Sequence, residues 1–197
     1  MQDKDTQRED IELMQALQAG DERAFNQLSH KYAPRLINFI YRFTGNQADA
    51  EDIAQEVFLK VYRSREAYRP VAAFSSWIYA IATHACLDYK KFARKDIIHH
   101  SRPIGTVGEE SEEHQADIAD THEKAVEAIV ERQGADRVVQ QTLIALPENQ
   151  RIALILKEYE DRSYADIAEV LDCSVSSVES LIFRARQKLK TLLSAEK

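Results

Sequence analysis

Apolar side chains recur at helical spacing along almost the whole chain, and only five glycines interrupt the pattern. Between residues 7 and 94 one amphipathic stripe follows another, with turns marked by Gly20–Asp21 and Thr44–Asn46. Asp21 is expected as a helix N-cap, and Pro34 at a helix start or bend. Because amphipathic helices can bury such stripes against one another, the sequence predicts an all-α protein.

The helical periodicity divides the 197-residue chain into three parts. It is lost between residues 96 and 122, where His, Pro, Gly and an acidic block at 109–113 predict an extended or flexible linker. It returns near residue 123 and breaks at Pro147, which can begin a new helix. We therefore expect two small helical domains: an N-terminal helical bundle over 1–95 and a C-terminal domain over 123–197, joined by an acidic flexible linker over 96–122.

Composition excludes several classes of function. Five dispersed glycines leave no glycine-rich loop for a nucleotide phosphate. Cys86 and Cys173 lack a second cysteine at the spacing of a zinc site, so they are expected to be free, buried thiols in a reducing compartment. No segment has the roughly 20 apolar residues of a membrane span, and the N-terminus does not resemble a signal peptide. These features predict a soluble cytoplasmic protein with no metal and no cofactor.

The net charge of −7 is distributed unevenly along the chain. Residues 58–95 carry eight basic and two acidic side chains, whereas residues 96–146 carry four basic and eleven acidic ones. Four further cations lie near the C-terminus, namely Arg184, Arg186, Lys188 and Lys190. Basic segments separated by an acidic segment indicate that only part of the surface binds a polyanion.

Residues 163–187, SYADIAEVLDCSVSSVESLIFRARQ, have the spacing of a helix-turn-helix. Ser163 and Asp166 approximate a capping box, and a tight turn is expected at Asp172 before the second helix. Leu171, Val178 and Leu181 are expected to face inward. The outward face of the second helix offers hydroxyl and guanidinium groups to DNA through Ser176, Ser177, Glu179, Ser180, Phe183, Arg184 and Arg186. A plain helical hairpin with a basic solvated face remains the alternative.

Two other features lie in the N-terminal part. Asp52, Gln55 and Glu56 share one exposed helix face, which spacing alone describes as an ordinary solvated acidic surface. The helix of residues 74–92 combines aromatic rings, which could stack on unpaired bases, with cations for phosphates. Its apolar stripe includes Phe74 and Trp77, for which core packing is at least as good an explanation. Four side chains are expected to point outward as better exposed candidates: Tyr79, His84, Asp88 and Lys91.

Four segments, in this order, resemble bacterial sigma factors of the extracytoplasmic-function (ECF) type, which direct RNA polymerase to promoters. They are ADAEDIAQEVFLKVY, FSSWIYAIATHACLDY, LPENQRIALIL and SYADIAEVLDCSVSSVESLIFRARQKL. The resemblance covers about residues 10–94 and 125–192. It implies that the first domain is similar to sigma region 2 and the second to sigma region 4. It also implies that the chain is the subunit that gives RNA polymerase its promoter specificity. Such a subunit is not an enzyme and has no small-molecule substrate.

The resemblance also implies roles for the first domain. Asp52, Gln55 and Glu56 match the family's contact with the clamp helices of the largest subunit of the RNA polymerase core. The loop at 67–73 and the following helix match the part that melts the minus-ten element and reads it as a single strand. The candidate residues for that contact are Tyr68, Arg69, Trp77, Tyr79, His84, Asp88, Lys90 and Lys91. His84 replaces a frequent Asn, so its base preference can differ.

In the second domain, the resemblance implies that Ser180, Phe183 and Arg184 contact the minus-thirty-five element as duplex DNA in its major groove, and that the polymerase flap region is a further contact. Glu179 and Leu181 depart from the family's frequent basic residues, so no promoter sequence is transferred. The acidic linker would pass near the polymerase active centre and RNA exit path. A further implied partner is an anti-sigma factor, commonly tethered to the membrane.

Two alternatives remain open on the residues alone. An autonomous helix-turn-helix regulator would bind duplex DNA without polymerase. Replacing Asp52 or Glu56 of the acidic face by Ala would then leave transcription unchanged. A metal-dependent enzyme would need ligands from His99, His100, His114 and His122, which lie in a polar stretch without paired short spacing.

Overall fold

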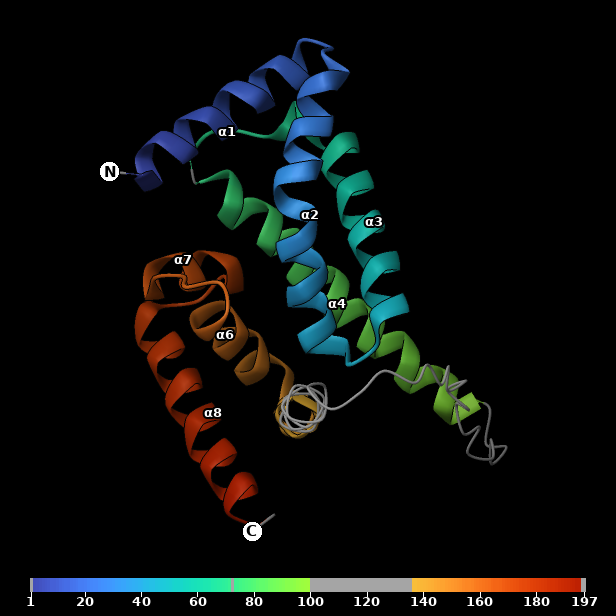
Figure 1. Ribbon diagram of the computed structural model, residues 1–197, viewed down its shortest axis with the longest axis vertical. Coiled ribbons are helices and arrows are strands. Elements are labelled where there is room, and N and C mark those ends of the chain that lie inside the picture. Colours follow the sequence, from blue (N-terminus) through green and yellow to red (C-terminus); the bar gives the residue numbers. More distant parts are fainter. Residues whose placement is uncertain (1, 72, 100–135, 196–197) are drawn as a thin grey trace, which may run out of the picture.

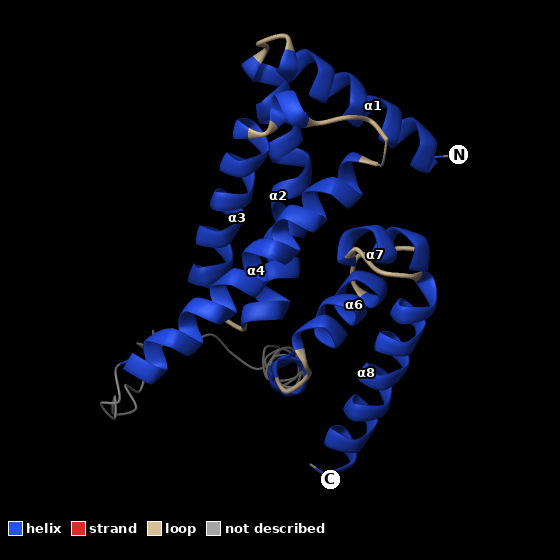
Figure 2. Cartoon of the chain, turned by 180° about the vertical axis from the view of Figure 1, so that it is seen from behind, coloured by secondary structure: helices blue, strands red, loops and turns tan. Residues whose placement is uncertain are grey.

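The computed structural model describes residues 2–71, 73–99 and 136–195, and every regular element within these ranges is helical (Figures 1 and 2). The expected all-α class with two helical domains is confirmed. In chain order the elements are α1 (Gln2–Gln18), α2 (Glu22–Thr44), α3 (Gln47–Arg63), the 3-10 helix η1 (Arg65–Ala67), α4 (Phe74–His99), a helix at 136–144, α6 (Glu148–Glu158), α7 (Tyr164–Leu171) and α8 (Val175–Ala195). None of the described helices is long and apolar enough to cross a membrane.

Local side-chain chemistry sets the ends of α2 and the start of α3. Asp21 caps α2 by accepting a hydrogen bond from the backbone N–H of Arg23 at 2.9 Å, as expected. At the other end, Gly45 adopts φ +81°, a left-handed conformation that glycine reaches without steric cost. Asn46 then caps α3 by accepting from two backbone N–H groups. The turn expected at Thr44–Asn46 is therefore confirmed.

Pro34 is an exception to the expected helix boundaries. Of the two positions expected for it, a helix start or a bend, the helix start is wrong, because Pro34 lies inside α2, which continues to Thr44. Proline removes one backbone donor from a helix interior. Buried side chains before and after it, including Tyr32 and Leu36, hold both halves of α2 against the same core. Tertiary packing therefore overrides the local preference of proline.

The first domain is a four-helix bundle whose apolar stripes face one another. Figure 1 shows α2 beside α3, with α4 crossing them and α1 lying along the first half of α2. The largest fully buried side chains in this core include Met14, Leu17, Leu28, Leu36, Phe39, Ile40, Phe43, Phe74 and Ile78. The last turn of α4 reaches His99, beyond residue 95, where the sequence placed the end of the first domain. The rest of the expected linker, residues 100–122, lies outside the described ranges.

The helix-turn-helix expected in the second domain is formed by α7 and α8. Ser163 and Asp166 make a complete capping box at the start of α7. Asp172 ends α7 with φ +48°, which aspartate tolerates better than most residues do. Leu171 and Leu181, both expected to face inward, are only half-buried. The buried positions of α8 are Val178, Ile182 and Ala185, because the second domain covers α8 on the side of these residues.

The two cysteines differ in their surroundings. Cys86 is buried in the first domain, and burial raises the pKa of its thiol to about 12. Cys173 was also expected to be buried, but it is partly exposed because it follows Asp172 in the turn between α7 and α8. Both thiols are free, as expected.

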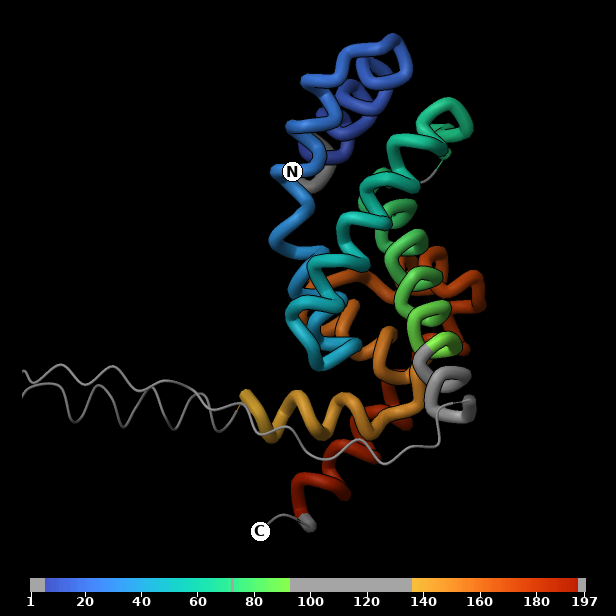
Figure 3. Tube along the Cα trace, turned by 90° about the vertical axis from the view of Figure 1, so that its right-hand side faces the viewer, coloured from blue at the N-terminus to red at the C-terminus, as the bar shows by residue number. Residues whose placement is uncertain are grey.

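The two domains pack directly against each other. Helix α7 lies against α4, and α6 lies against α2 (Figures 1 and 3). Arg151 of α6 is 3% exposed and donates to the Phe43 carbonyl of α2 at 2.5 Å. It also donates to the carbonyls of Leu146, at 3.0 Å, and of Ile144. Burial lowers the pKa of its guanidinium, because a low-polarity environment disfavours the charged form.

Replacing Ser163 by Ala removes one side of the capping box, because the Asp166 N–H loses its side-chain acceptor. We expect a loss of about 1 kcal/mol in the free energy of unfolding of the second domain. Denaturant unfolding followed by far-UV circular dichroism measures it. Ser194→Ala, at the exposed end of α8, is the matched control and should change stability by less than about 0.5 kcal/mol. Equal effects of the two substitutions would contradict the capping role.

Candidate functional site

The acidic face of the first domain lies on α3. Asp52, Gln55 and Glu56 are all exposed, and within the described part of the chain neither carboxylate has a salt-bridge partner. A groove runs between α3 and α4 beside this face. Its lining consists of Asp49, Asp52, Ile53, Glu56 and Lys60 from α3 and Ala85, Asp88, Tyr89 and Phe92 from α4. The structure thus shows that side chains of α4 also line the groove beside this face, which the sequence placed on α3 alone.

Tyr89 and Asp49 connect the two helices of this groove. The Tyr89 hydroxyl donates to Asp49 Oδ2 at 2.6 Å. Burial, and then this hydrogen bond to a carboxylate, raise the pKa of Tyr89 to about 12, so the hydroxyl remains a donor at neutral pH. Asp49 is thus occupied within the protein, whereas Asp52 and Glu56 remain available to an outside cation. No local sequence signal predicts this pairing, because 40 residues separate the two partners.

The aromatic residues expected to stack on unpaired bases are mostly buried. Tyr68 is 4% exposed and packs against Phe74 and Trp77, with ring centroids 6.0 and 5.0 Å away. Trp77 itself is half-buried. These rings form one cluster at the start of α4, and core packing accounts for most of their surface. The interpretation of Tyr68 as an exposed stacking residue is wrong for this conformation.

Tyr79 was expected to point outward and is instead fully buried. Its ring packs edge-on against Phe39, with centroids 5.3 Å apart, and its hydroxyl donates to Glu160 of the second domain at 2.5 Å. Burial and the neighbouring Glu160 raise the pKa of Tyr79. The apolar pattern along α4 shows one buried stripe, but the second domain covers an additional face of the helix.

The other residues assigned to the minus-ten element are more accessible. Arg69, His84, Asp88 and Lys91 are exposed, and Lys90 is half-buried. His84 Nδ1 lies 2.8 Å from the Ala80 carbonyl, which leaves Nε2 as the ring nitrogen that can meet another group. Lys91 pairs with Asp88 at 3.1 Å on the surface, where such a pair contributes little to stability and can exchange partners.

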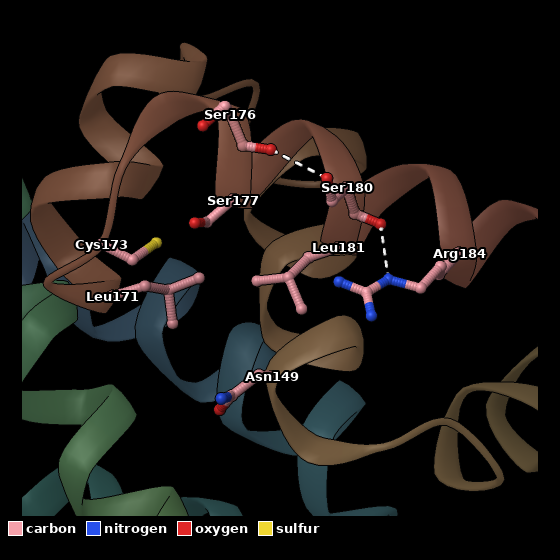
Figure 4. A pocket seen from close by; sticks show the side chains of 8 residues that line it. All are labelled: Asn149, Leu171, Cys173, Ser176, Ser177, Ser180, Leu181 and Arg184. Carbon is pink, nitrogen blue, oxygen red and sulfur yellow. Dashed lines mark hydrogen bonds between the residues drawn. The ribbon is translucent and has the colours of Figure 1, made fainter.

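The outward face of α8 has the composition that the sequence predicted. Its seven assigned residues are all exposed: Ser176, Ser177, Glu179, Ser180, Phe183, Arg184 and Arg186. Ser180 donates to the Ser176 carbonyl at 3.0 Å, and Arg184 Nε donates to the Ser180 carbonyl at 3.1 Å (Figure 4). Phe183 is 64% exposed, which is unusual for a large apolar side chain. The face therefore presents hydroxyls, two guanidinium groups, a carboxylate and one ring to solvent.

The groove beside α8 includes residues from outside that helix. Asn149 of α6, Leu171 and Cys173 line it together with Ser176, Ser177, Ser180, Leu181 and Arg184 (Figure 4). Asn149 and Cys173 were not predicted as part of the face, because only the fold brings α6 and the turn next to α8. Arg186 differs from its neighbours, since it donates to Glu158 at 2.6 Å. That bond raises the pKa of its guanidinium and directs Arg186 toward α6.

A metal centre finds no support in the described residues. Among the side chains that the structure describes, no three from His, Cys, Asp or Glu gather in a way that could hold an ion. Of the histidines considered as ligands, His100, His114 and His122 lie outside the described ranges, as does the side chain of His99.

Comparison with known proteins relates both domains to one family. Residues 28–95 match Sigma-70 region 2, and residues 136–189 match Sigma-70 region 4. The RNA polymerase sigma-H factor of Pseudomonas aeruginosa is 37% identical over 191 residues, which cover 95% of each chain. The ECF RNA polymerase sigma-E factor of Haemophilus influenzae is 33% identical over 186 residues, covering 92% of this chain and 93% of that protein.

Solved structures share the fold. CnrH, in complex with the cytosolic domain of CnrY, aligns with a TM-score of 0.67 and 24% identity over 96% of this chain and 99% of that one. The sigma factor RpoE of Bartonella quintana, in complex with the anti-sigma factor NepR, aligns with a TM-score of 0.59 and 21% identity over 88% of this chain and 98% of that one. The family models and the near full-length relatives show that the chain belongs to the sigma-70 family as an ECF sigma factor, a transcription initiation factor and not an enzyme.

Proposed function

We propose that this sigma factor binds the RNA polymerase core through Asp52, Gln55 and Glu56 of α3. The observation that carries the proposal is that Asp52 and Glu56 are exposed and have no salt-bridge partner in the described part of the chain, while Asp49 beside them is held by Tyr89. Unpaired carboxylates on a rigid helix favour a partner with basic side chains, because complementary charge speeds association and fixes register. The clamp of the largest polymerase subunit is the partner that the family resemblance implies.

The proposed contact with the minus-thirty-five element is made by α8 in the major groove of duplex DNA. Arg184 and the serine hydroxyls can meet base edges and phosphates, and exposed Phe183 can contact an apolar thymine methyl group. Asn149 extends the same groove from α6 and adds an amide that can donate and accept. A flap contact of the second domain belongs to the same proposal.

The proposed contact with the minus-ten element starts from the accessible residues of the first domain. Arg69, His84, Lys90 and Lys91 can follow a single strand in the docked conformation described above. Tyr68 and Tyr79 are buried and Trp77 is half-buried, so their participation requires a rearrangement. DNA binding by the chain alone should be weak, since the net charge of −7 opposes the phosphate field. Polymerase is therefore the first partner.

An anti-sigma factor is the further partner that we propose. Support comes from the fold neighbour RpoE of Bartonella quintana, which was solved with its anti-sigma factor NepR. Membrane tethering of such a partner, and passage of the acidic linker near the RNA exit path, stay predictions from the family resemblance.

Replacing both Asp52 and Glu56 by Ala should weaken binding of the chain to purified bacterial core RNA polymerase by at least about tenfold, because desolvated interface charges lose their partners. Fluorescence anisotropy of the labelled chain measures the dissociation constant, and in vitro transcription from a pool of promoter fragments measures initiation. The control is the double variant Glu12→Ala, Glu22→Ala. It changes the net charge by the same amount as the Asp52 and Glu56 variant, but on the exposed surfaces of α1 and α2.

The outcome separates two functions. If polymerase binding is lost only in the Asp52 and Glu56 variant, α3 is the core-binding face. If neither the parent chain nor any variant binds polymerase, while the chain binds a duplex DNA alone, the autonomous regulator is correct instead.

Replacing Arg184 by Ala should reduce initiation from promoters that depend on the minus-thirty-five element. We expect a loss of about 1–3 kcal/mol in holoenzyme binding if Arg184 reads a base, with weaker discrimination at one position of the element. Competition binding of holoenzyme to promoter fragments with single-base changes measures it. Arg137→Ala removes another exposed cation of the second domain, outside α8, and is the control. A uniform loss across all sequences would instead assign Arg184 to a phosphate.

A further inference from the structure

The segment that connects η1 to α4 passes beside α1 (Figures 1 and 2). Gln18, the last residue of α1, donates through Nε2 to the Arg65 carbonyl at 2.7 Å and to the Tyr68 carbonyl at 3.2 Å. A side-chain amide has two N–H donors, so one glutamine can satisfy both carbonyls. Helix α1, which has no residue assigned to a partner, therefore holds the backbone at the start of this segment.

Secondary structure fixes this segment only in part. Within the described residues 65–71, regular backbone bonding is limited to the 3-10 turn η1. There the N–H groups of Ala67 and Tyr68 bond to the carbonyls of Ser64 and Arg65, at 2.9 and 3.2 Å. Connecting segments of this kind are ordinarily more mobile than the helices they join. The two bonds from Gln18 tie the segment to a helix that is itself packed on α2.

The Tyr68 carbonyl accepts from a second side chain, Arg69. Arg69 Nη1 donates to this carbonyl at 2.9 Å and to the Glu66 carbonyl at 2.7 Å. Arg69 is exposed and is one of the residues proposed to follow the separated DNA strand, so its guanidinium must leave these carbonyls to meet a phosphate. The bond from Gln18 does not depend on Arg69. The backbone at Tyr68 therefore keeps a partner when Arg69 turns to the DNA.

A second residue of α1 supports the aromatic rings beside the same segment. Asp10 is 2% exposed and accepts from the Tyr32 hydroxyl at 2.5 Å. The Tyr32 ring packs edge-on against Phe74, with centroids 5.2 Å apart, and the Phe74 and Tyr68 centroids are 6.0 Å apart. Helix α1 thus reaches the Tyr68 backbone through Gln18 and the Tyr68 ring through this row of side chains.

We propose that Gln18 is a positioning residue for capture of the separated strand, because its two hydrogen bonds hold the backbone that carries Arg69. The inference rests on the proposed function, since it deepens the minus-ten contact. Gln18 acts through the Arg65 and Tyr68 carbonyls and not by touching DNA. A segment that is ordered before binding loses less conformational entropy when it binds. Gln18 therefore contributes to strand capture and not to core binding, whose proposed face lies on α3.

Three substitutions separate the amide donor from the rest of the Gln18 side chain. Gln18→Met keeps an unbranched stem but removes the donor, and Gln18→Glu places acceptors against two carbonyls. Gln18→Lys supplies a donor again. All three residues form helices well, so α1 should persist, which far-UV circular dichroism verifies. Gln15→Met, at an exposed position of the same helix, is the matched control.

The first experiment measures the order of the segment in the free chain. Trp77 is the only tryptophan in the sequence, and its ring centroid lies 5.0 Å from that of Tyr68, so its fluorescence reports on this contact. Quenching by acrylamide should increase in Gln18→Met and Gln18→Glu, because a less anchored Tyr68 exposes Trp77. Gln18→Lys and Gln15→Met should be quenched to the same extent as the parent chain.

The second experiment measures promoter opening by holoenzyme assembled from each chain and purified core RNA polymerase. The probe is a promoter fragment on which the parent holoenzyme initiates, and permanganate oxidation of unpaired thymines measures the rate of opening. Loss of the donor should slow opening by about three- to tenfold, which corresponds to about one net hydrogen bond. Gln18→Lys should restore most of the rate. The dissociation constant for core should be the same for every variant.

Each result decides a separate point. Unchanged quenching in both Gln18→Met and Gln18→Glu shows that Gln18 does not hold the segment. Increased quenching with unchanged opening overturns the role in strand capture. An opening defect that Gln18→Lys does not restore, or an equal loss of core binding, also overturns it and assigns the effect to packing of α1. If the parent holoenzyme initiates on no promoter fragment, the proposed function is overturned, while quenching still decides the contact of Gln18.

Discussion

The arrangement of this protein depends on burying charged groups between two helical domains. Arg151 and Glu160 are each 3% exposed, and each has partners across the domain boundary. A buried charge whose partner is removed costs several kcal/mol, so neither group can remain in place if the domains move apart slightly. The interface is therefore either closed with its hydrogen bonds made or open to water, and intermediate separations are unfavourable.

This constraint affects the candidate faces differently. The acidic face of α3 and the outward face of α8 lie away from the domain interface and are exposed in the docked chain. The face of α4 that contains Tyr79 lies at the interface and is covered. In this conformation the faces of α3 and α8 are therefore accessible to a partner, whereas the α4 face around Tyr79 is not.

Short-range sequence signals predicted local features correctly. The N-cap at Asp21, the turn at Gly45, the capping box at Ser163 and the tight turn at Asp172 all follow from chemistry within four residues. The exposed face of α8 was also predicted, because one helix period determines which side chains point away from the core. A helix start at Pro34, one of its two expected positions, is wrong, because the tolerance of proline inside α2 depends on packing from other helices.

The sequence by itself therefore determined the helical class, the main turns, the exposed side chains of α3 and α8, and the resemblance to ECF sigma factors, because these depend on spacing within a helix or on contiguous motifs. The tertiary structure alone decided that Tyr68 and Tyr79 are buried, that Asn149 and Cys173 join the α8 groove, and that Tyr89 holds Asp49. Each of these depends on contacts between distant segments. The 81 residues between Tyr79 and Glu160 show the reason: helical periodicity identifies a buried stripe, but it carries no information about a second domain that covers another face of the same helix.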